Sequence, residues 1–442
     1  MFFRKITREL KKWKLQSNGK TALLIEGARR VGKSTVVEEF AKNEYRSYIL
    51  IDFAEAPLDI QDLFSDTSNL DYIFLQLQLR YSVQLFERES LIIFDEVQLC
   101  PSARQAIKQL VKDGRYDYIE TGSLISIRKN IAHILIPSEE QRIQMRPMDY
   151  EEFLWAQGDE STFPLLEQTF TSETALGEQL NRKLMRDFRL YMLVGGMPQA
   201  VDAYLQTNNL QVVDETKRMI IDLYEEDFYK ISPSGVLSLL FDAIPAQLAK
   251  KSSRYHVSSV LSKRRASDIL EEIAELRESK TVLVAYHVDD PNVGMSSSID
   301  LEKFKLYMAD TGLFVSLAFK DSDFTENIIY EKLLSDKLPV NLGAVYENVV
   351  AQELVAHGHK LFYHTWAKDM ANRDYEIDFI TSAGKKICPI EVKSSGYKTH
   401  ASLDEFFKKF SSRIGKQFLV YTKDIKKDNS IICLPTYMSY FL

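Results

Sequence analysis

A glycine-rich segment near the N-terminus has the residue types and spacing of a phosphate-binding loop. Residues 27–34 read GARRVGKS and fit the pattern G-x-x-x-x-G-K-[ST]. Glycines at these positions let backbone N–H groups surround phosphate oxygens, while the lysine reaches the β and γ oxygens and the hydroxyl reaches Mg²⁺. Lys33 is therefore also expected to act in catalysis, and Ser34 to ligate the metal. The residues expected to contact ATP are Gly27, Ala28, Arg29, Arg30, Val31, Gly32, Lys33, Ser34 and Thr35.

Two acids follow an apolar run and complete the chemistry of nucleotide hydrolysis. The run LIIF at 91–94 leads directly into Asp95 and Glu96. Parallel strands present ligand-binding side chains at their carboxyl ends, so we expect Asp95 in the Mg²⁺ shell. Glu96 is placed to polarise the attacking water. The alternative is a strand that ends in solvated acids.

Hydroxyl and guanidinium groups downstream are candidates for sensing the γ-phosphate. Thr121 or Ser123, in the segment TGS, would supply a hydroxyl between the two motifs, although a plain turn is the alternative. Arg128 and Arg142 are candidates for neutralising transition-state charge, with Arg142 preferred as catalytic. Either arginine could instead serve at a surface or an interface.

Carboxylates in the last quarter of the chain have the spacing of a divalent-cation site. Asp378 lies between apolar neighbours in YEIDFI, and Glu391 and Lys393 alternate with apolar residues in PIEVKS, so both point to one strand face. A turn at 383–385 can pair the two strands and bring Asp378 toward Glu391. The two acids would bind a hard cation that activates water, and Lys393 would act as a catalytic residue on a phosphodiester. The alternatives are a half-buried hairpin with a solvated edge, or a fold that holds nucleic acid without cutting it.

Basic residues concentrate between 250 and 265, although the whole chain carries a formal net charge of −7. The cluster consists of Lys250, Lys251, Arg254, Lys263, Arg264 and Arg265. Helical patterns around it, followed by strand-like segments at 281–288 and 303–308, indicate a winged helix with Arg264 and Arg265 opening the recognition helix on DNA. A protein-binding winged helix or a solvated loop is the alternative.

The elements that must position these groups follow from hydrophobic patterning. Short apolar runs at 21–26, 46–53, 91–94 and 116–119 alternate with helical stretches, which predicts a parallel sheet buried on both faces. Helical periodicity then dominates from 150 to 230, and strand patterns return after a helix at 342–357. The fold class is therefore α/β.

Composition narrows the class of protein. With 442 residues, 45% hydrophobic and 27% charged, the chain is expected to be globular and multidomain. We find no apolar stretch of ~20 residues and no leader-like N-terminus, so we expect a cytoplasmic protein without a membrane span. Three distant cysteines disfavour disulfide and zinc frameworks.

The motifs together resemble a group of prokaryotic AAA+-like ATPases whose C-terminal half is a domain of unknown function related to PD-(D/E)xK nucleases. The resemblance rests on GARRVGKS, LIIFDE, TGS, RPMDYEEFL, YMLVGGMPQAV, KLYMADTGL, GAVYENVVAQEL, YEIDFI and PIEVKS. It departs at Ala28 and Ser34, where the group often has Pro and Thr. The resemblance implies ATP binding and adds Glu347 to Asp378 and Glu391 as a metal ligand of the nuclease class, but it brings no settled substrate.

Five regions are expected from these patterns and from the resemblance. They are an N-terminal amphipathic helix at 1–18, a P-loop ATPase core at 19–149, a helical lid at 150–231, a winged-helix-like domain at 232–320 and a PD-(D/E)xK nuclease-like domain at 321–442. The expected function is ATP binding and Mg²⁺-dependent hydrolysis by a homo-oligomer that acts on or binds DNA. The alternatives are a nucleotide-switch regulator and an assembly scaffold, neither of which cuts DNA.

Overall fold

The structure is a computed structural model, and its chain divides into two compact units. One comprises Met1–Arg146 with Glu278–Lys280, and the other comprises Pro147–Arg277 with Thr281–Leu442. The residues described are 2–122, 138–250, 252–321, 327–335, 343–368, 374–395 and 399–442. Within these ranges, no helix combines the length and the apolar character needed to cross a bilayer.

The first unit is built on a five-stranded parallel sheet with strand order β2-β3-β4-β1-β5. Its strands are β1 (Ala22–Glu26), β2 (Ser47–Asp52), β3 (Ser90–Asp95), β4 (Asp117–Gly122) and β5 (Glu140–Gln144). The parallel sheet is thus confirmed, and its first four strands coincide with the apolar runs. The edge strand β5 was not predicted because its sequence, EQRIQ, has a single apolar residue.

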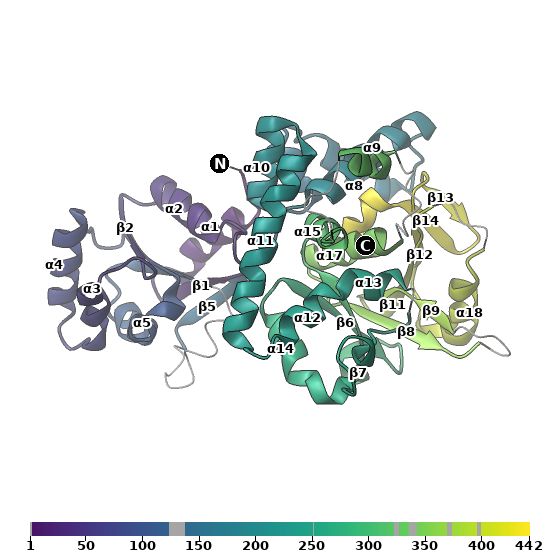
Figure 1. Cartoon of the computed structure of the whole chain (residues 1–442). Helices are drawn as coiled ribbons and strands as arrows, with labels where there is room; N and C mark the ends of the chain where they lie inside the picture. Colours follow the sequence, from purple (N-terminus) through teal and green to yellow (C-terminus); the bar gives the residue numbers. More distant parts are fainter. Residues whose placement is uncertain are drawn as a thin grey trace. The chain divides into compact units, whose positions relative to one another are not determined.

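Helices cover both faces of this sheet (Figure 1). They are α1 (Ile6–Ser17), α2 (Lys33–Glu44), α3 (Leu58–Asp62), α4 (Leu70–Tyr81) and α5 (Pro101–Asp113). Helix α5 shows how the sequence sets an element: Pro101 starts it, Gly114 ends it in the left-handed region, and Ile107 and Leu110 face the core. The apolar core between the sheet and α3 to α5 fixes the carboxyl ends of the strands, where the phosphate loop lies.

The second unit has helices both before and between its strands. They are α7 (Tyr150–Ala156), α8 (Thr162–Ser172), α9 (Glu178–Val194), α10 (Pro198–Thr207), α11 (Leu210–Ile231), α12 (Val236–Asp242), α13 (Ile244–Ala249), α14 (Leu270–Glu278), α15 (Thr311–Ala318), α16 (Asn327–Leu334), α17 (Gly343–Ala356) and α18 (Ala401–Phe410). Asp149 and Glu152 form a capping box at the start of α7, which accounts for the MDYEEFL motif.

Two further sequence motifs pack against each other. The Asp310 carboxylate accepts a hydrogen bond from the Gly196 backbone at 2.5 Å and caps α15 through Leu313 N at 2.9 Å. A Cβ atom on Gly196 would lie 2.0 Å from the Met148 carbonyl oxygen, so a larger residue cannot fit there without backbone movement. The segments YMLVGGMPQAV and KLYMADTGL therefore meet to close the core of this unit.

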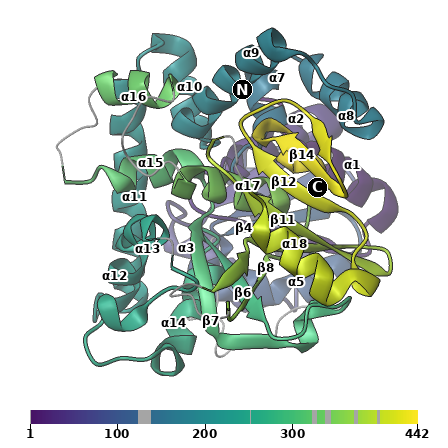
Figure 2. The ribbon, with the colours of Figure 1, turned by 90° about the vertical axis from the view of Figure 1, so that its right-hand side faces the viewer.

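Two sheets complete the second unit (Figure 2). One is four-stranded with order β7-β6-β8-β9, and the other is five-stranded with order β10-β11-β12-β14-β13. Their strands are β6 (Val282–Val288), β7 (Ile299–Met308), β8 (Phe362–Trp366), β9 (Tyr375–Ile377), β10 (Phe379–Ala383), β11 (Lys386–Val392), β12 (Gln417–Tyr421), β13 (Lys426–Asp428) and β14 (Ile431–Pro435).

The strands expected as a two-stranded wing belong to the four-stranded sheet. β6 and β7 pair with each other, and β6 also pairs in parallel with β8 through Tyr286 and Phe362. The sheet thus joins strands from both sides of the boundary expected at residue 320. The physical reason is burial: the end of β7, Phe304 to Met308, is buried, whereas an independent wing would leave one face in water.

The strand expected at 375–381 is interrupted at Asp378. Tyr375–Ile377 pairs with β8, while Phe379–Ala383 pairs with β11 in the other sheet. Asp378 therefore lies where the chain passes from one sheet to the next, with its carboxylate accepting a hydrogen bond from Val392 N at 2.7 Å.

Candidate functional sites

The phosphate loop connects β1 to α2. Gly32 adopts a φ of 94°, which favours glycine, and Lys33 is the first residue of the helix that follows. The Lys33 ammonium is buried and donates to the carbonyls of Gly27 at 3.1 Å and Ala28 at 3.0 Å. Burial lowers the pKa of Lys33, an effect opposed by the nearby carboxylates of Glu96 and Asp95. The loop thus places the Lys33 ammonium among backbone groups at a helix N-terminus, as phosphate binding requires.

Asp95 is the meeting point of three elements. Its Oδ1 atom accepts hydrogen bonds from Ser34 Oγ at 2.8 Å and from Thr121 Oγ1. Ser34 comes from α2, Asp95 ends β3, and Thr121 lies near the end of β4. A hydroxyl and a carboxylate in contact are the hard oxygen donors that suit Mg²⁺, so Ser34 and Asp95 fit the ion that they were expected to hold.

Glu96 follows Asp95 in the left-handed region, with φ of 51°. This conformation turns its backbone N–H toward Thr121 Oγ1, 3.4 Å away, and its carboxylate accepts a hydrogen bond from Gln98. Gln98 was not among the expected site residues, because its position depends on the 3₁₀ turn Val97–Leu99 rather than on any motif.

The remaining nucleotide-site candidates have different surroundings. Val31 is buried, and its carbonyl accepts from Arg4 at 2.9 Å, a support that the sequence did not indicate. Arg142 lies on β5 and pairs with Glu140 at 2.7 Å and with Glu26 at 3.6 Å. These contacts join Arg142 to carboxylates of its own unit. Arg29, Arg30 and Thr35 lie in or beside the loop, whereas Ser123 and Arg128 fall outside the described residues.

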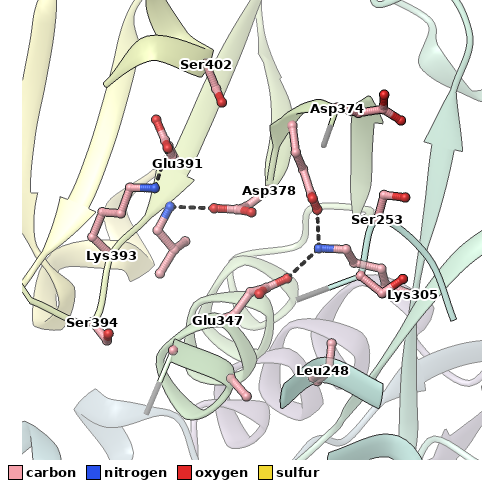
Figure 3. A pocket seen from close by; sticks show the side chains of 15 residues that line it. Leu248, Ser253, Lys305, Glu347, Asp374, Asp378, Glu391, Lys393, Ser394 and Ser402 are labelled. Atoms are coloured by element: carbon pink, nitrogen blue, oxygen red, sulfur yellow. Dashed lines mark hydrogen bonds and ion pairs between the residues drawn. The ribbon is translucent and has the colours of Figure 1, made fainter. Parts of the chain in front are cut away.

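A cavity of about 530 Å³ in the second unit collects the C-terminal candidates (Figure 3). Its charged lining residues are Lys305, Glu347, Asp374, Glu376, Asp378, Glu391 and Lys393. Glu347 comes from α17, Asp378 from the junction of β9 and β10, and Glu391 from β11. The structure therefore brings together all four residues expected here from the sequence.

Glu391 and Lys393 lie on the same side of β11 and its extension. Lys393 Nζ is 2.5 Å from Glu391 Oε1, and its pKa is raised, because nearby carboxylates, led by Glu391, outweigh burial. The second carboxylate oxygen of Glu391, Oε2, is buried without a hydrogen-bond partner. An unpartnered buried oxygen is the kind of group that a cation would satisfy.

Lys305 and Glu376 were missed from the sequence. The Lys305 ammonium lies between Glu347, 2.9 Å away, and Glu376, which it also contacts. The Tyr307 hydroxyl donates a hydrogen bond to Glu347. The pKa of Lys305 is raised well above its usual value, since the surrounding acids, led by Glu347, outweigh burial. The alternation K-x-K-x-Y in β7 and E-x-D across the 376–378 segment was the available signal.

Two carboxyl groups of the cavity have raised pKa values. Burial, reinforced by Glu347, raises the pKa of Asp378 well above its usual value, and burial likewise raises the pKa of Glu376. The ligand atoms of Glu347, Asp378 and Glu391 do not all lie within 4.8 Å of one another in the described part of the chain. Binding one ion through all three would therefore require side-chain movement toward the centre of the cavity.

Two other groups noted from the sequence lie elsewhere. His364 is a packed residue: it is buried, its Nδ1 donates to the Val288 carbonyl at 2.7 Å, and its ring stacks on Trp366. Arg264 pairs with Glu272 at 3.6 Å, and Arg265 directly precedes the 3₁₀ turn Ala266–Ile269, which continues into α14. Lys251 of the basic cluster is outside the described residues.

Comparison with known families assigns three segments of the chain. Residues 19–154 match the family described as AAA domain (AAA_14). Residues 185–323 match a domain of unknown function, DUF8612, and residues 342–437 match another, DUF4143. No curated protein sequence matches the chain significantly.

Several solved structures show a distant likeness. A Walker-type ATPase of Pyrococcus abyssi is 17% identical with a TM-score of 0.41, over 72% of this chain and 96% of that one. The ORC1 protein of Aeropyrum pernix in complex with DNA is 12% identical with a TM-score of 0.29, over 76% and 93% of the two chains. A RuvB variant of Thermotoga maritima is 10% identical with a TM-score of 0.29, over 64% and 89%.

The family match and the geometry agree for the first unit. Residues 19–154 match an AAA domain, and the phosphate loop and parallel sheet of the first unit are those of a P-loop domain that binds ATP.

Proposed function

We propose that the protein is a Mg²⁺-dependent ATPase. The observation that carries this proposal is the convergence of Ser34, Asp95 and Thr121 at the carboxyl ends of the sheet, directly beside Lys33. Passive nucleotide binding needs the loop alone, whereas this arrangement also supplies a metal ligand and, next to it, the carboxylate of Glu96.

Each side chain has a distinct part in this proposal. Ser34 and Asp95 would hold Mg²⁺, which neutralises charge on the β and γ phosphates when bound. Lys33 leaves the loop carbonyls for the phosphate oxygens, Glu96 takes the proton of the attacking water, and Thr121 orients Asp95. Arg142, or in an assembly the arginine of a neighbouring copy, would stabilise the transition state.

Two substitutions separate binding from hydrolysis. Lys33→Ala should abolish binding of a fluorescent ATP analogue, whereas Glu96→Gln should bind it with near parental affinity and release phosphate at least about 100-fold more slowly. Glu55→Gln, at an exposed acid of the same unit, is the matched control and should retain both properties. Phosphate release at the parental rate by Glu96→Gln would refute the role given to Glu96.

We propose metal-dependent cleavage of a nucleic-acid phosphodiester as a second activity, located in the acidic cavity. Support comes from Asp378, Glu391 and Lys393 lining one space, with Glu391 Oε2 unpartnered. Asp378, Glu391 and Glu347 would hold the ion, which supplies an activated water when bound. Lys393 would stabilise charge on the phosphate, because an ammonium cannot ligate a metal.

The competing proposal is a nucleotide-controlled binding protein that does not cut. Lys305 favours it, because its ammonium already pairs with Glu347 and Glu376. Cleavage of linear, branched and single-stranded DNA with Mn²⁺ distinguishes the two. Asp378→Asn should eliminate any cleavage and leave ATP hydrolysis unchanged, while Glu302→Gln, an exposed acid on β7, should cut like the parent. Absence of cleavage on every DNA form would favour the binding protein.

A further inference from the structure

A second group of metal-ligating side chains lies away from the acidic cavity, at the end of the β6–β7 hairpin. His287, Asp289 and Asp300 place one potential ligand atom each within 4.8 Å of the other two. No other set of three such groups, among the residues that the structure describes, is this close. The family resemblance and the ATPase proposal make no use of these residues.

The local sequence builds this cluster through an irregularity in strand pairing. The register between β6 and β7 shifts between Tyr286 and His287, after which His287 pairs directly with Asp300. Bulges of this kind redirect side chains, and direct cross-strand partners place their side chains on the same face of the sheet. Asp289 follows His287 by two residues and therefore shares that face.

The imidazole has a nitrogen available for a ligand. His287 is only 4% exposed, and its Nδ1 atom is buried without a hydrogen bond, although Asp289 Oδ1 lies 3.2 Å away. Its Nε2 atom accepts a hydrogen bond from the backbone N–H of Thr365 at 3.2 Å, and the Thr365 carbonyl oxygen lies 3.4 Å from the same atom. While Nε2 accepts from Thr365, the imidazole proton lies on Nδ1, toward Asp289. An ion bound at Nδ1 would displace this proton, and Nε2–H would then donate to the Thr365 carbonyl, as in metal sites whose histidine is oriented by a backbone acceptor.

The carboxylates can also turn to an ion. Asp289 is 65% exposed and has free space to rotate. Asp300 accepts a hydrogen bond from Glu302 N at 2.9 Å and pairs with Lys303 at 3.0 Å. Lys303 is 41% exposed, so its ammonium can move into water when a cation takes its place.

We propose that His287, Asp289 and Asp300 bind a divalent first-row transition metal ion such as Zn²⁺. One imidazole nitrogen with two carboxylates suits these metals, whereas Mg²⁺ and Ca²⁺ prefer oxygen donors alone. Water would fill the remaining positions. The ion links β7 to β6 at the bulge. Because His287 contacts Thr365 of β8, the ion also stabilises the position of β8. Thr365 in turn pairs with Glu376 of the cavity. Its role is therefore structural support of the sheet that carries Lys305 and Glu376.

The nature of the donors separates this site from the cavity. None of the described residues lining the cavity is a histidine, so an ion bound there has no imidazole ligand. Electron spin-echo spectroscopy of the full chain with one equivalent of Cu²⁺ should show the remote nitrogen of an imidazole. Calorimetry with Zn²⁺ gives the affinity.

Asp289→Asn and Asp300→Asn should each weaken Zn²⁺ binding at least about tenfold and reduce the imidazole signal. His287→Gln should remove that signal. If His287→Gln fails to fold, the exposed Asp289 still provides the test. Glu302→Gln, beside the site, and His400→Ala, in a separate histidine–carboxylate cluster with Asp404, are the controls and should bind like the parent. Parental affinity in both aspartate variants, an absent imidazole signal, or loss of Zn²⁺ binding in Glu391→Gln alone would overturn the proposal.

Discussion

Thr121 donates a hydrogen bond from its hydroxyl to the carboxylate of Asp95, across the neighbouring strands β4 and β3. The same carboxylate oxygen accepts from Ser34 of the phosphate loop. Asp95 is therefore oriented from two sides before any ion binds. The backbone N–H of Glu96 also faces the Thr121 hydroxyl, so one side chain on β4 positions both acids.

Removing this hydroxyl should damage hydrolysis more than binding. Outer-shell partners of metal ligands typically contribute 10- to 100-fold to metal affinity or activity. We therefore expect Thr121→Ala to slow phosphate release by about 10- to 100-fold and to raise the Mg²⁺ concentration needed for half-maximal rate. Thr121→Ser keeps the hydroxyl and should recover most of the rate. Equal rates for Ala and Ser would show that the hydrogen bond has no catalytic part.

DNA binding should depend on salt through Arg264 and Arg265. Each phosphate contact contributes ~0.9 to the slope of log K against log salt, so the double alanine variant should lower that slope by about 2. Fluorescence anisotropy with a labelled duplex between 50 and 300 mM salt, about the range where such slopes are resolved, gives the measurement. An unchanged slope would indicate that this region binds protein instead; Glu271→Ala, on the acidic side of α14, is the control variant.

Local patterns predicted the first unit well. The apolar runs of β1 to β4 are self-contained signals, and the phosphate loop must follow a strand and precede a helix, so Lys33 and Ser34 could be placed from spacing alone. Gln98 and Arg4 could not be placed in this way. Gln98 depends on the unusual backbone of Glu96, and Arg4 reaches the loop from a segment 27 residues away in sequence.

In the second unit, the alternation in PIEVKS predicted that Glu391 and Lys393 share one face of their strand. The residues that meet them in the cavity are remote in sequence. Lys305 meets Glu347 across 42 residues, and nothing in either segment specifies the pairing. The break at Asp378 was also hidden, because YEIDFI reads as one continuous strand. The pairing of β9 with β8 and of β10 with β11 determines that break, and such non-local pairing has no signature in a single sequence.

Lowering the pH should reduce the stability of the second unit through protonation of His364. Burial lowers the pKa of His364 from 6.5 to about 4. The unfolded chain therefore binds a proton near pH 6.5 that the folded chain does not bind until about pH 4, so the free energy of unfolding falls as the pH drops through that window. The loss from this group is at most about 3 kcal/mol, at 1.36 kcal/mol for each pH unit. Urea unfolding at pH 7 and pH 5 should show a smaller loss for His364→Asn, which retains a side-chain donor near Val288; an equal loss would exclude His364 as the source.

Replacing Lys305 with methionine should have opposite effects on the stability and the metal affinity of the second unit. Lys305 is the buried cation between Glu347 and Glu376, and removing one partner of a buried ion pair typically costs 3–5 kcal/mol. We expect Lys305→Met to lower the free energy of unfolding by about that amount in the absence of metal. The variant also makes the cavity more negative by one charge and frees Glu347 to ligate, so Mn²⁺ should bind more tightly, by about tenfold, and restore part of the lost stability by mass action. Urea unfolding with and without Mn²⁺, together with calorimetric titration, measures both effects. Lys385→Met, in the exposed turn between β10 and β11, controls for loss of a positive charge at a distance and should change neither quantity. Weaker Mn²⁺ binding in Lys305→Met would mean that the lysine positions the acids for the ion, and tighter binding that it competes with the ion for them.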